Sequence, residues 1–179
     1  MPVFYGRTAM VSTRNVKMKI GIMSDTHNHL DRTKVAVDRL VECSVEAIFH
    51  CGDLATPEIL VACSVLPFYF VFGNHDADEV PDLTRAAQEF GATCLAWGGE
   101  VELAGRRIAM THGHLRSDLQ PLLDAEPDYL LTGHSHATHD RMVGATRRIN
   151  PGALFRASEF TVAILDLRTD HLQFLTIPR

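Results

Sequence analysis

The sequence predicts an α/β protein with an α+β-like second half, in which two packed mixed β-sheets are flanked by helices. In the first half of the chain, short apolar runs alternate with amphipathic runs of helical period, as in a parallel sheet. In the second half, apolar and polar residues alternate one by one over several short runs, which is typical of strands. Because no repeat, linker or low-complexity tract interrupts this order, we expect a single domain over residues 18–179.

Three strands and three helices are predicted in the first half. Thr56-Pro57 is a good helix start, because the hydroxyl can cap the helix and proline suits its first position. Pro67 discourages continuation of that helix, and Gly91 closes the next one. The predicted strands are 19–23, 47–49 and 68–72, and the predicted helices are 31–44, 56 to about 66, and 83–90.

The second half is expected to consist mainly of strands. Ala104-Gly105 permits a tight turn between two alternating runs, and a short helix is expected around residues 117–123. The predicted strands are 101–103, 108–110, 129–131, 141–143 and 146–149, followed by a terminal hairpin of 162–167 and 172–177.

Composition narrows the classes of partner. The net charge of −5 and the pI near 6.0 indicate no broad basic surface, which argues against nucleic acid. No apolar run approaches the roughly 20 residues of a membrane span, so we expect no membrane association. The four cysteines form no CxxC pair and are interpreted as reduced thiols of a cytoplasmic protein, Cys43 and Cys63 as apolar residues on helix faces.

Residues 1–17 are predicted to be a disordered N-terminal extension. They contain Arg7, Arg14 and Lys17 without an acidic residue, and they lack the apolar stretch of a secretory signal. A transit peptide, and an upstream start codon with Met18 as the functional start, are the alternatives.

Five of the expected strands end in loops that carry metal-binding side chains. Strand ends at the carboxyl edge of a sheet are where open α/β folds collect their ligands, and neighbouring glycines allow the backbone to approach closely. Any one of these loops could arise by chance, but all five in order predict a metal site. The loops are Asp25-Thr-His27, Gly52-Asp53, Gly73-Asn-His-Asp76, His112-Gly-His114 and Gly133-His-Ser-His136.

This series of loops resembles the full signature of the calcineurin-like metallophosphoesterase family. The short length and the lack of a cap domain are similar to the small bacterial and archaeal phosphodiesterases of that family. The resemblance covers nearly all of the chain from Met18 onward. It implies the metallophosphoesterase fold, a four-layer sandwich of two sheets with helices outside.

The resemblance also implies a site for two divalent transition-metal ions. Asp53 would be the bridging carboxylate, which offsets part of the repulsion between two dications about 3.5–4 Å apart. Carboxylate, imidazole and amide ligands suit Mn²⁺, taken as the first choice, or Fe, Zn²⁺ or Ni²⁺, better than Ca²⁺. The first ion would be held by Asp25, His27, Asp53 and His136, and the second by Asp53, Asn74, His112 and His134.

The activity implied is hydrolysis of a small phosphodiester by a metal-bridging hydroxide. His75 would assist the leaving group as a catalytic acid, and Asp76 is expected to orient the His75 ring. His114 is a candidate for substrate contact, whereas His50 is expected to pack near its strand end. Asn150-Pro-Gly-Ala153 resembles the Asn-Pro-Gly-Ser of the family with alanine in fourth place, and is otherwise a simple turn.

Three alternatives stay open. A protein-binding scaffold of the retromer-subunit type shares the fold, but such scaffolds lose metal ligands and this chain keeps all seven. A nuclease would be expected to carry extra domains and a basic surface. A phosphomonoesterase usually needs more positive charge around the phosphate, so the lack of a concentrated Arg/Lys clamp favours diesters. Association into homo-oligomers, which small members of the family often show, is not marked by any interface signature.

Overall fold

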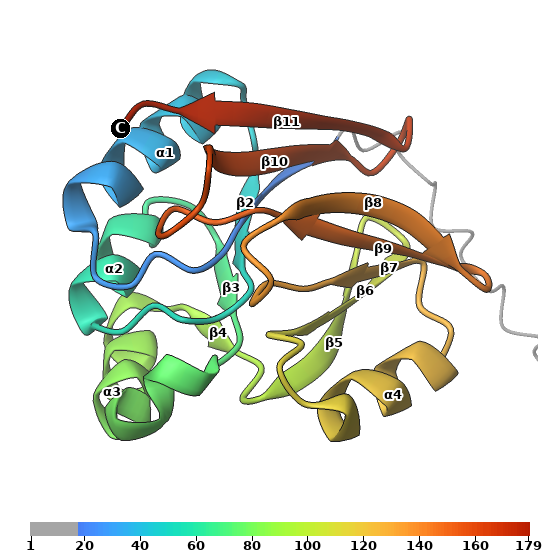
Figure 1. The fold of residues 1–179 in the computed structure, drawn as a ribbon, viewed down its shortest axis with the longest axis horizontal. Coiled ribbons are helices and arrows are strands. Elements are labelled where there is room, and N and C mark those ends of the chain that lie inside the picture. The colour runs from blue at the N-terminus through green and yellow to red at the C-terminus, as the bar shows by residue number, and fades with distance from the viewer. Residues whose placement is uncertain (1–17) are drawn as a thin grey trace, which may run out of the picture.

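The computed structural model describes residues 18–179, and the prediction for residues 1–17 lies outside them. Two mixed sheets pack face to face, with helices on their outer sides (Figure 1). This arrangement confirms the predicted α/β class with two packed sheets. The packing of both sheets onto a shared core supports our proposal that residues 18–179 form one domain.

The first sheet has six strands in the order β11-β10-β1-β2-β3-β4. Its central strands are parallel, whereas β10 pairs antiparallel with β1 and with β11. The strands are β1 (Lys19–Met23), β2 (Ala47–His50), β3 (Phe68–Phe70), β4 (Thr93–Cys94), β10 (Phe160–Asp166) and β11 (His171–Ile177). The short strand β4 at the sheet edge was not predicted.

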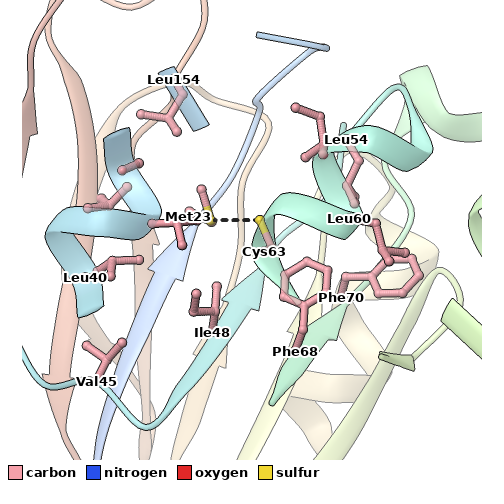
Figure 2. Close-up of a cluster of buried hydrophobic side chains, with 14 of the residues drawn as sticks. Met23, Leu40, Val45, Ile48, Leu54, Leu60, Cys63, Phe68, Phe70 and Leu154 are labelled. Atoms are coloured by element: carbon pink, nitrogen blue, oxygen red, sulfur yellow. Dashed lines mark hydrogen bonds between the residues drawn. The ribbon is translucent and has the colours of Figure 1, made fainter. Parts of the chain in front are cut away.

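Three helices cover the outer face of this sheet. They are α1 (Leu30–Glu42), α2 (Pro57–Cys63) and α3 (Val80–Phe90). Figure 2 shows apolar side chains of α1 and α2 meeting those of the strands, and the Cys63 thiol lies 3.7 Å from the Met23 sulfur. Gly21 lets α1 pack closely, because a Cβ there would lie 2.8 Å from Leu40 Cδ1. Helix α2 ends at Cys63, earlier than predicted, and the hydroxyl and N–H of the following Ser64 both bond to the carbonyl of Leu60.

The second sheet has five strands in the order β5-β6-β7-β9-β8, and α4 (Arg116–Asp124) packs on β5 and β6 (Figure 1). The predicted hairpin at Ala104-Gly105 is confirmed, with both residues at positive φ. The strands are β5 (Gly98–Leu103), β6 (Arg106–Thr111), β7 (Tyr129–Leu131), β8 (Thr138–Val143) and β9 (Thr146–Pro151).

The core between the sheets is formed by alternate strand residues. In β1, Ile20 and Ile22 face the second sheet, while Met23 faces the helices. In β2, Phe49 faces the second sheet and stacks on Tyr69 at 4.7 Å. Burial of both strand faces explains why these strands read as continuous apolar runs rather than as alternating ones. It also holds the strand ends of the two sheets in fixed relative positions.

Candidate metal centre

The loops after β1, β2, β3, β6 and β7 converge on one pocket of about 450 Å³. Five of the seven expected ligands line it, and the other two, Asp25 and His112, lie against ligands that do. The His136 Nε2 atom lies 3.1 Å from Asp25 Oδ1. Asp53 Oδ2 lies 3.3 Å from His27 Nε2 and also 3.3 Å from His112 Nε2. One carboxylate oxygen therefore faces two imidazoles that come from different sheets.

Within residues 18–179, three groups of candidate ligands have atoms within 4.8 Å of one another. These groups are Asp25/His27/His136, His27/Asp53/His75 and Asp25/Asp53/His112. Asn74 adds an amide oxygen, 3.1 Å from His112 Nε2. His134 belongs to none of the three groups. Its ring lies 5.2 Å from the His112 ring, and its backbone N–H donates a hydrogen bond to Asp25 Oδ2 at 3.1 Å. The structure thus brings all seven expected side chains to one place.

The backbone of these loops is unusual. Five of the seven expected ligands have φ between 42° and 67°, a region that non-glycine residues rarely adopt. They are Asp25, His27, Asp53, His134 and His136. Such conformations cost free energy and persist only where the surroundings enforce them, so they concentrate at functional sites.

Two glycines make room for the carboxylates. A methyl group at Gly73 would overlap the Asp53 carboxylate, and one at Gly133 would overlap the Ser24 hydroxyl and lie 2.9 Å from Asp25 Oδ2. Ser24 itself donates to Asp25 Oδ2 at 2.5 Å. These glycines are needed because the loops pass closer to the carboxylates than any side chain would allow.

Hydrogen bonds select the tautomers of two histidines. His112 Nδ1–H donates to the carbonyl of Cys51 at 2.8 Å, and His136 Nδ1–H donates to the carbonyl of Arg156 at 3.4 Å. With Nδ1 as the donor, each ring directs Nε2 toward the pocket, where the neutral imidazole can bind a metal ion.

Two buried atoms of the site, Asp25 Oδ1 and His27 Nε2, have no hydrogen-bond partner among residues 18–179. Buried polar atoms are rarely left unpaired, and an anionic oxygen without a donor is costly. A cation bound between Asp25, His27 and His136 would satisfy both atoms. The residues present therefore fit a metal ion.

The charges of the site favour an ionised Asp53. Burial raises the pKa of Asp53, but the His112 ring, the N–H of His75 and the His27 ring outweigh burial and lower it to about 2. His75 N–H donates to Asp53 Oδ1 at 2.9 Å. Burial lowers the pKa of His112, yet its contact with the Asp53 and Asp25 carboxylates raises it above the ordinary value. Asp53 is thus an anion ready to bind cations.

Asp76 has a different partner from the one expected. Its carboxylate accepts the N–H groups of Asp53, Gly73 and Ala55 at 2.7–2.8 Å, and none of the hydrogen bonds of residues 18–179 joins it to the His75 ring. Burial raises its pKa, although the N–H donors oppose that rise. The assignment to ring orientation is therefore corrected, because three buried N–H groups need this acceptor. Asp76 ties the Asp53 loop to the Asn74 loop.

His50 is buried at the end of β2, where the sequence placed it. The Gly52 N–H points at His50 Nδ1, so Nε2 carries the proton and donates to the Thr26 hydroxyl at 3.1 Å. Thr26 in turn donates to the Asp53 carbonyl at 3.2 Å. This chain of bonds holds the Asp53 loop from beneath. Burial lowers the pKa of His50 to about 3, so the ring is neutral.

Of the remaining histidines, one lines the pocket and two lie outside its lining. His75 lines the pocket, and its ring lies 4.9 Å from that of His27. His114 does not line the pocket; its ring lies 5.5 Å from the His112 ring, and its buried Nδ1 has no hydrogen-bond partner within the described residues. His139 is half-buried on β8, and burial lowers its pKa.

The sequence assigned no role in the metal site to three residues that support or line it. Asn150 was read as part of a turn, but its amide donates to the Gly133 carbonyl at 2.7 Å and to the Ser135 hydroxyl at 3.1 Å. It therefore fixes the loop of His134 and His136. Phe155 and Arg156 line the pocket from the segment after β9. Their position after Asn150-Pro-Gly, again at a strand end, is the signal that could have found them.

Two packed mixed sheets with ligands gathered at one edge define the metallophosphoesterase fold. The chain belongs to the calcineurin-like phosphoesterase superfamily, whose domain model matches residues 18–170. None of the described helices is both long and apolar enough to cross a membrane.

Several known proteins are similar to this chain. A phosphodiesterase of Methanocaldococcus jannaschii is 29% identical over 156 residues, which are 83% of this chain and 93% of the relative. The solved structure of an archaeal phosphodiesterase matches with a TM-score of 0.81 and 26% identity, over 89% of this chain and 100% of that one. A structure of a single mutant of Vps29 from Entamoeba histolytica shares the fold alone, with a TM-score of 0.62 and 18% identity over 90% of this chain and 100% of that one.

The close approach at Gly73 leads to a first prediction. Gly73→Ala should lose bound metal, because the added methyl group overlaps the Asp53 carboxylate and must displace it. Gly105→Ala is the matched control: its φ of 74° makes alanine cost about 1 kcal/mol, but nothing lies within 4 Å of the new methyl group. Metal content of both purified variants measures the effect. Full metal occupancy in Gly73→Ala would show that the loop can move without harm.

Neutral His50 leads to a second prediction, on acid stability. The folded-state pKa of about 3 lies below the ordinary 6.5, so the unfolded chain binds more protons between these values. The contribution of His50 is complete above pH 6.5 and falls by about 1.4 kcal/mol per pH unit as pH drops towards 3.

Urea unfolding of metal-free protein between pH 4 and 7 measures this slope. In His50→Gln the slope should be smaller by about one proton, whereas the exposed His171→Gln should behave as wild type. An unchanged slope in His50→Gln would mean that His50 is charged when folded.

Proposed function

We propose that this protein is a dinuclear-metal-dependent phosphodiesterase that hydrolyses a small phosphodiester. The observation that carries the proposal is the position of Asp53 Oδ2, 3.3 Å from the Nε2 atoms of both His27 and His112. A carboxylate shared between two sets of ligands is what a pair of cations requires, because it reduces their mutual repulsion.

In this proposal, two sets of side chains that share Asp53 hold the metal ions. Mn²⁺ is proposed first, with Fe, Zn²⁺ and Ni²⁺ as the other ions that this donor set suits. When bound, such ions make bound water acidic enough to attack phosphorus at neutral pH and stabilise the charge on the phosphoryl oxygens. The first set is Asp25, His27, Asp53 and His136, and the second is Asp53, Asn74, His112 and His134.

His75 is proposed to protonate the leaving group. Hydrolysis forms a phosphorus–oxygen bond to water and breaks the ester bond, and the departing alkoxide needs a proton. The His75 ring is exposed in the pocket, while the backbone N–H of His75 donates a hydrogen bond to Asp53 Oδ1. Asp76 then contributes indirectly, since its three bonds to backbone N–H groups hold the loops that carry Asp53 and His75.

A diester is the proposed substrate because the pocket offers little positive charge beyond the metal ions. Arg156 alone among its lining residues is an arginine or lysine, and a dianionic monoester would favour more of them. The archaeal relatives cited above are both named phosphodiesterases, which also supports a diester substrate. The free cysteines, two of them buried, support our proposal of a reducing, cytoplasmic compartment.

A third prediction tests the metal site and the substrate class together. Protein purified without chelator and loaded with Mn²⁺ should hold close to two metal ions per chain, and hydrolyse bis-p-nitrophenyl phosphate faster than p-nitrophenyl phosphate. Asp53→Ala should lose metal and activity, because both ligand sets share this carboxylate. Asp38→Ala, an exposed carboxylate on α1, should keep both.

Each other outcome has a definite meaning. Preference for the monoester would keep the site but overturn the diester. A folded wild-type protein without metal or turnover would overturn the enzyme and leave the protein-binding scaffold, whose fold this chain shares.

A fourth prediction concerns His75. His75→Ala should retain metal but lower kcat by roughly 10²–10⁴-fold for an ester with a poor leaving group, and by much less for p-nitrophenolate, which needs no proton to depart. His171→Ala, exposed on β11, is the control. Metal content and kcat for the two kinds of ester are the measurements. Loss of metal in His75→Ala would make His75 a ligand, as its group with His27 and Asp53 allows.

A further inference from the structure

One wall of the pocket is formed by planar side chains that the proposed chemistry does not use. Phe155 and Arg156, from the segment between β9 and β10, line the same pocket as His27, His75 and Asp53. Phe155 is half-buried and Arg156 is exposed. Neither belongs to the apolar cores of the fold, so their side chains face the pocket for some other reason.

These side chains form a stack. The His29 ring lies on the Phe155 ring with centroids 4.8 Å apart and planes 29° from parallel. The Arg156 guanidinium carbon lies 4.9 Å from the Phe155 centroid. His29 lines a separate neighbouring cavity of about 590 Å³, so the part of the stack that borders the metal pocket consists of Phe155 and Arg156.

The stack is held in place relative to the metal-binding residues. The Arg156 carbonyl accepts the Nδ1–H of His136 at 3.4 Å, and the Phe155 ring packs against the His27 ring at 4.8 Å. The preceding Leu154 is buried, and its carbonyl accepts a bond from Arg32 at 2.5 Å. A group bound on this wall would therefore have a defined position with respect to a phosphate bound at the metal-binding residues.

The chemistry of the wall selects a kind of ligand. Aromatic rings and guanidinium planes both stack on planar groups, and proteins use both to bind nucleobases. Arg156 takes part in none of the ion pairs found within residues 18–179, so no carboxylate holds its guanidinium group, which lies beside the Phe155 ring. An alkyl or glycerol group would gain little from such a surface.

We propose that Phe155 and Arg156 form a stacking subsite for a planar aromatic group of the phosphodiester. The substrate class is then an aryl or nucleoside diester rather than an alkyl diester. This inference rests on the proposed function, because it concerns the part of the same substrate that is not at the reacting phosphorus.

Equilibrium binding of two inert ligands tests the subsite without turnover. Calorimetry of the Mn²⁺-loaded protein should show phenylphosphonate binding about tenfold more tightly than methylphosphonate, the usual scale of one stacking contact. Phe155→Ala and Phe155→Leu should reduce this preference to less than about twofold, and Phe155→Tyr should retain it. Leucine maintains packing against His27, so a loss there reports the missing ring. Phe174→Ala, 37% exposed on β11, is the control and should behave as wild type.

Substitutions of Arg156 separate its plane from its charge. Arg156→Lys should lose the preference for the aromatic ligand as Arg156→Ala does, because lysine keeps the charge but offers no plane. If lysine restores the preference, the role assigned to the guanidinium plane is wrong.

A kinetic series identifies the source of the planar group. Methyl, phenyl and thymidine 5′ esters of p-nitrophenyl phosphate all release p-nitrophenolate, so they differ only in the group that stays. The wild-type kcat/KM should be higher for the phenyl or the thymidine ester than for the methyl ester. A higher value for the phenyl ester would indicate an aryl substrate, and a higher value for the thymidine ester would indicate a nucleoside substrate. Phe155→Ala should lower the value for the favoured ester about tenfold more than it lowers the value for the methyl ester.

Other results would overturn the subsite. Equal losses for all three esters, or no wild-type preference in binding, would show that Phe155 only supports the fold of the segment. The absence of metal and of turnover for every ester in wild-type protein would instead refute the proposed function, which makes the two failures distinguishable.

Discussion

The close contact of the Asp53 carboxylate with two imidazoles is the constraint on which the rest of the site depends. Asp53 comes from a loop of the first sheet and His112 from a loop of the second, so their contact requires the sheets to be packed in one relative position. The core between the sheets provides this, since Ile22, Phe49 and Met110 are fully buried there. Packing of apolar side chains well below the site thus determines the separation of its ligands.

The site works against the stability of the fold that holds it. Asp25 and Asp53 are buried carboxylates with imidazoles as close neighbours, and both adopt left-handed backbone conformations. Burial of charge and strained backbone both cost free energy. Metal binding would offset this cost, because a ligand that binds only the folded chain stabilises it. The apolar cores on both sides of the first sheet stabilise the folded state against this free-energy cost when no metal is bound.

Polar residues around the expected ligands form hydrogen bonds that hold the loops of the pocket in place. Asp76 collects three backbone N–H groups, His50 and Thr26 support the Asp53 loop, and Asn150 ties the β9 end to the loop of His134 and His136. None of these residues needs to touch substrate to matter. Groups of this kind orient ligands, and their loss typically weakens metal binding by about 10–100-fold. The wall of Phe155 and Arg156 is attached to this layer through the bond between the Arg156 carbonyl and His136.

The sequence by itself determined the class of fold, most strands and helices, and the seven side chains that lie close together at the site, five of them lining the pocket. This was possible because strand runs, helix periodicity and the ligand-bearing loops that follow them are local patterns. Only the tertiary structure decided that the terminal hairpin joins the first sheet beside β1, that Asp76 binds backbone N–H groups instead of His75, and that Phe155 faces the metal site. These features depend on partners far apart in the chain, such as Ile22 with Ala163 and His27 with Phe155. No local pattern encodes such pairings, since burial and hydrogen-bond demand select them only when the two sheets pack.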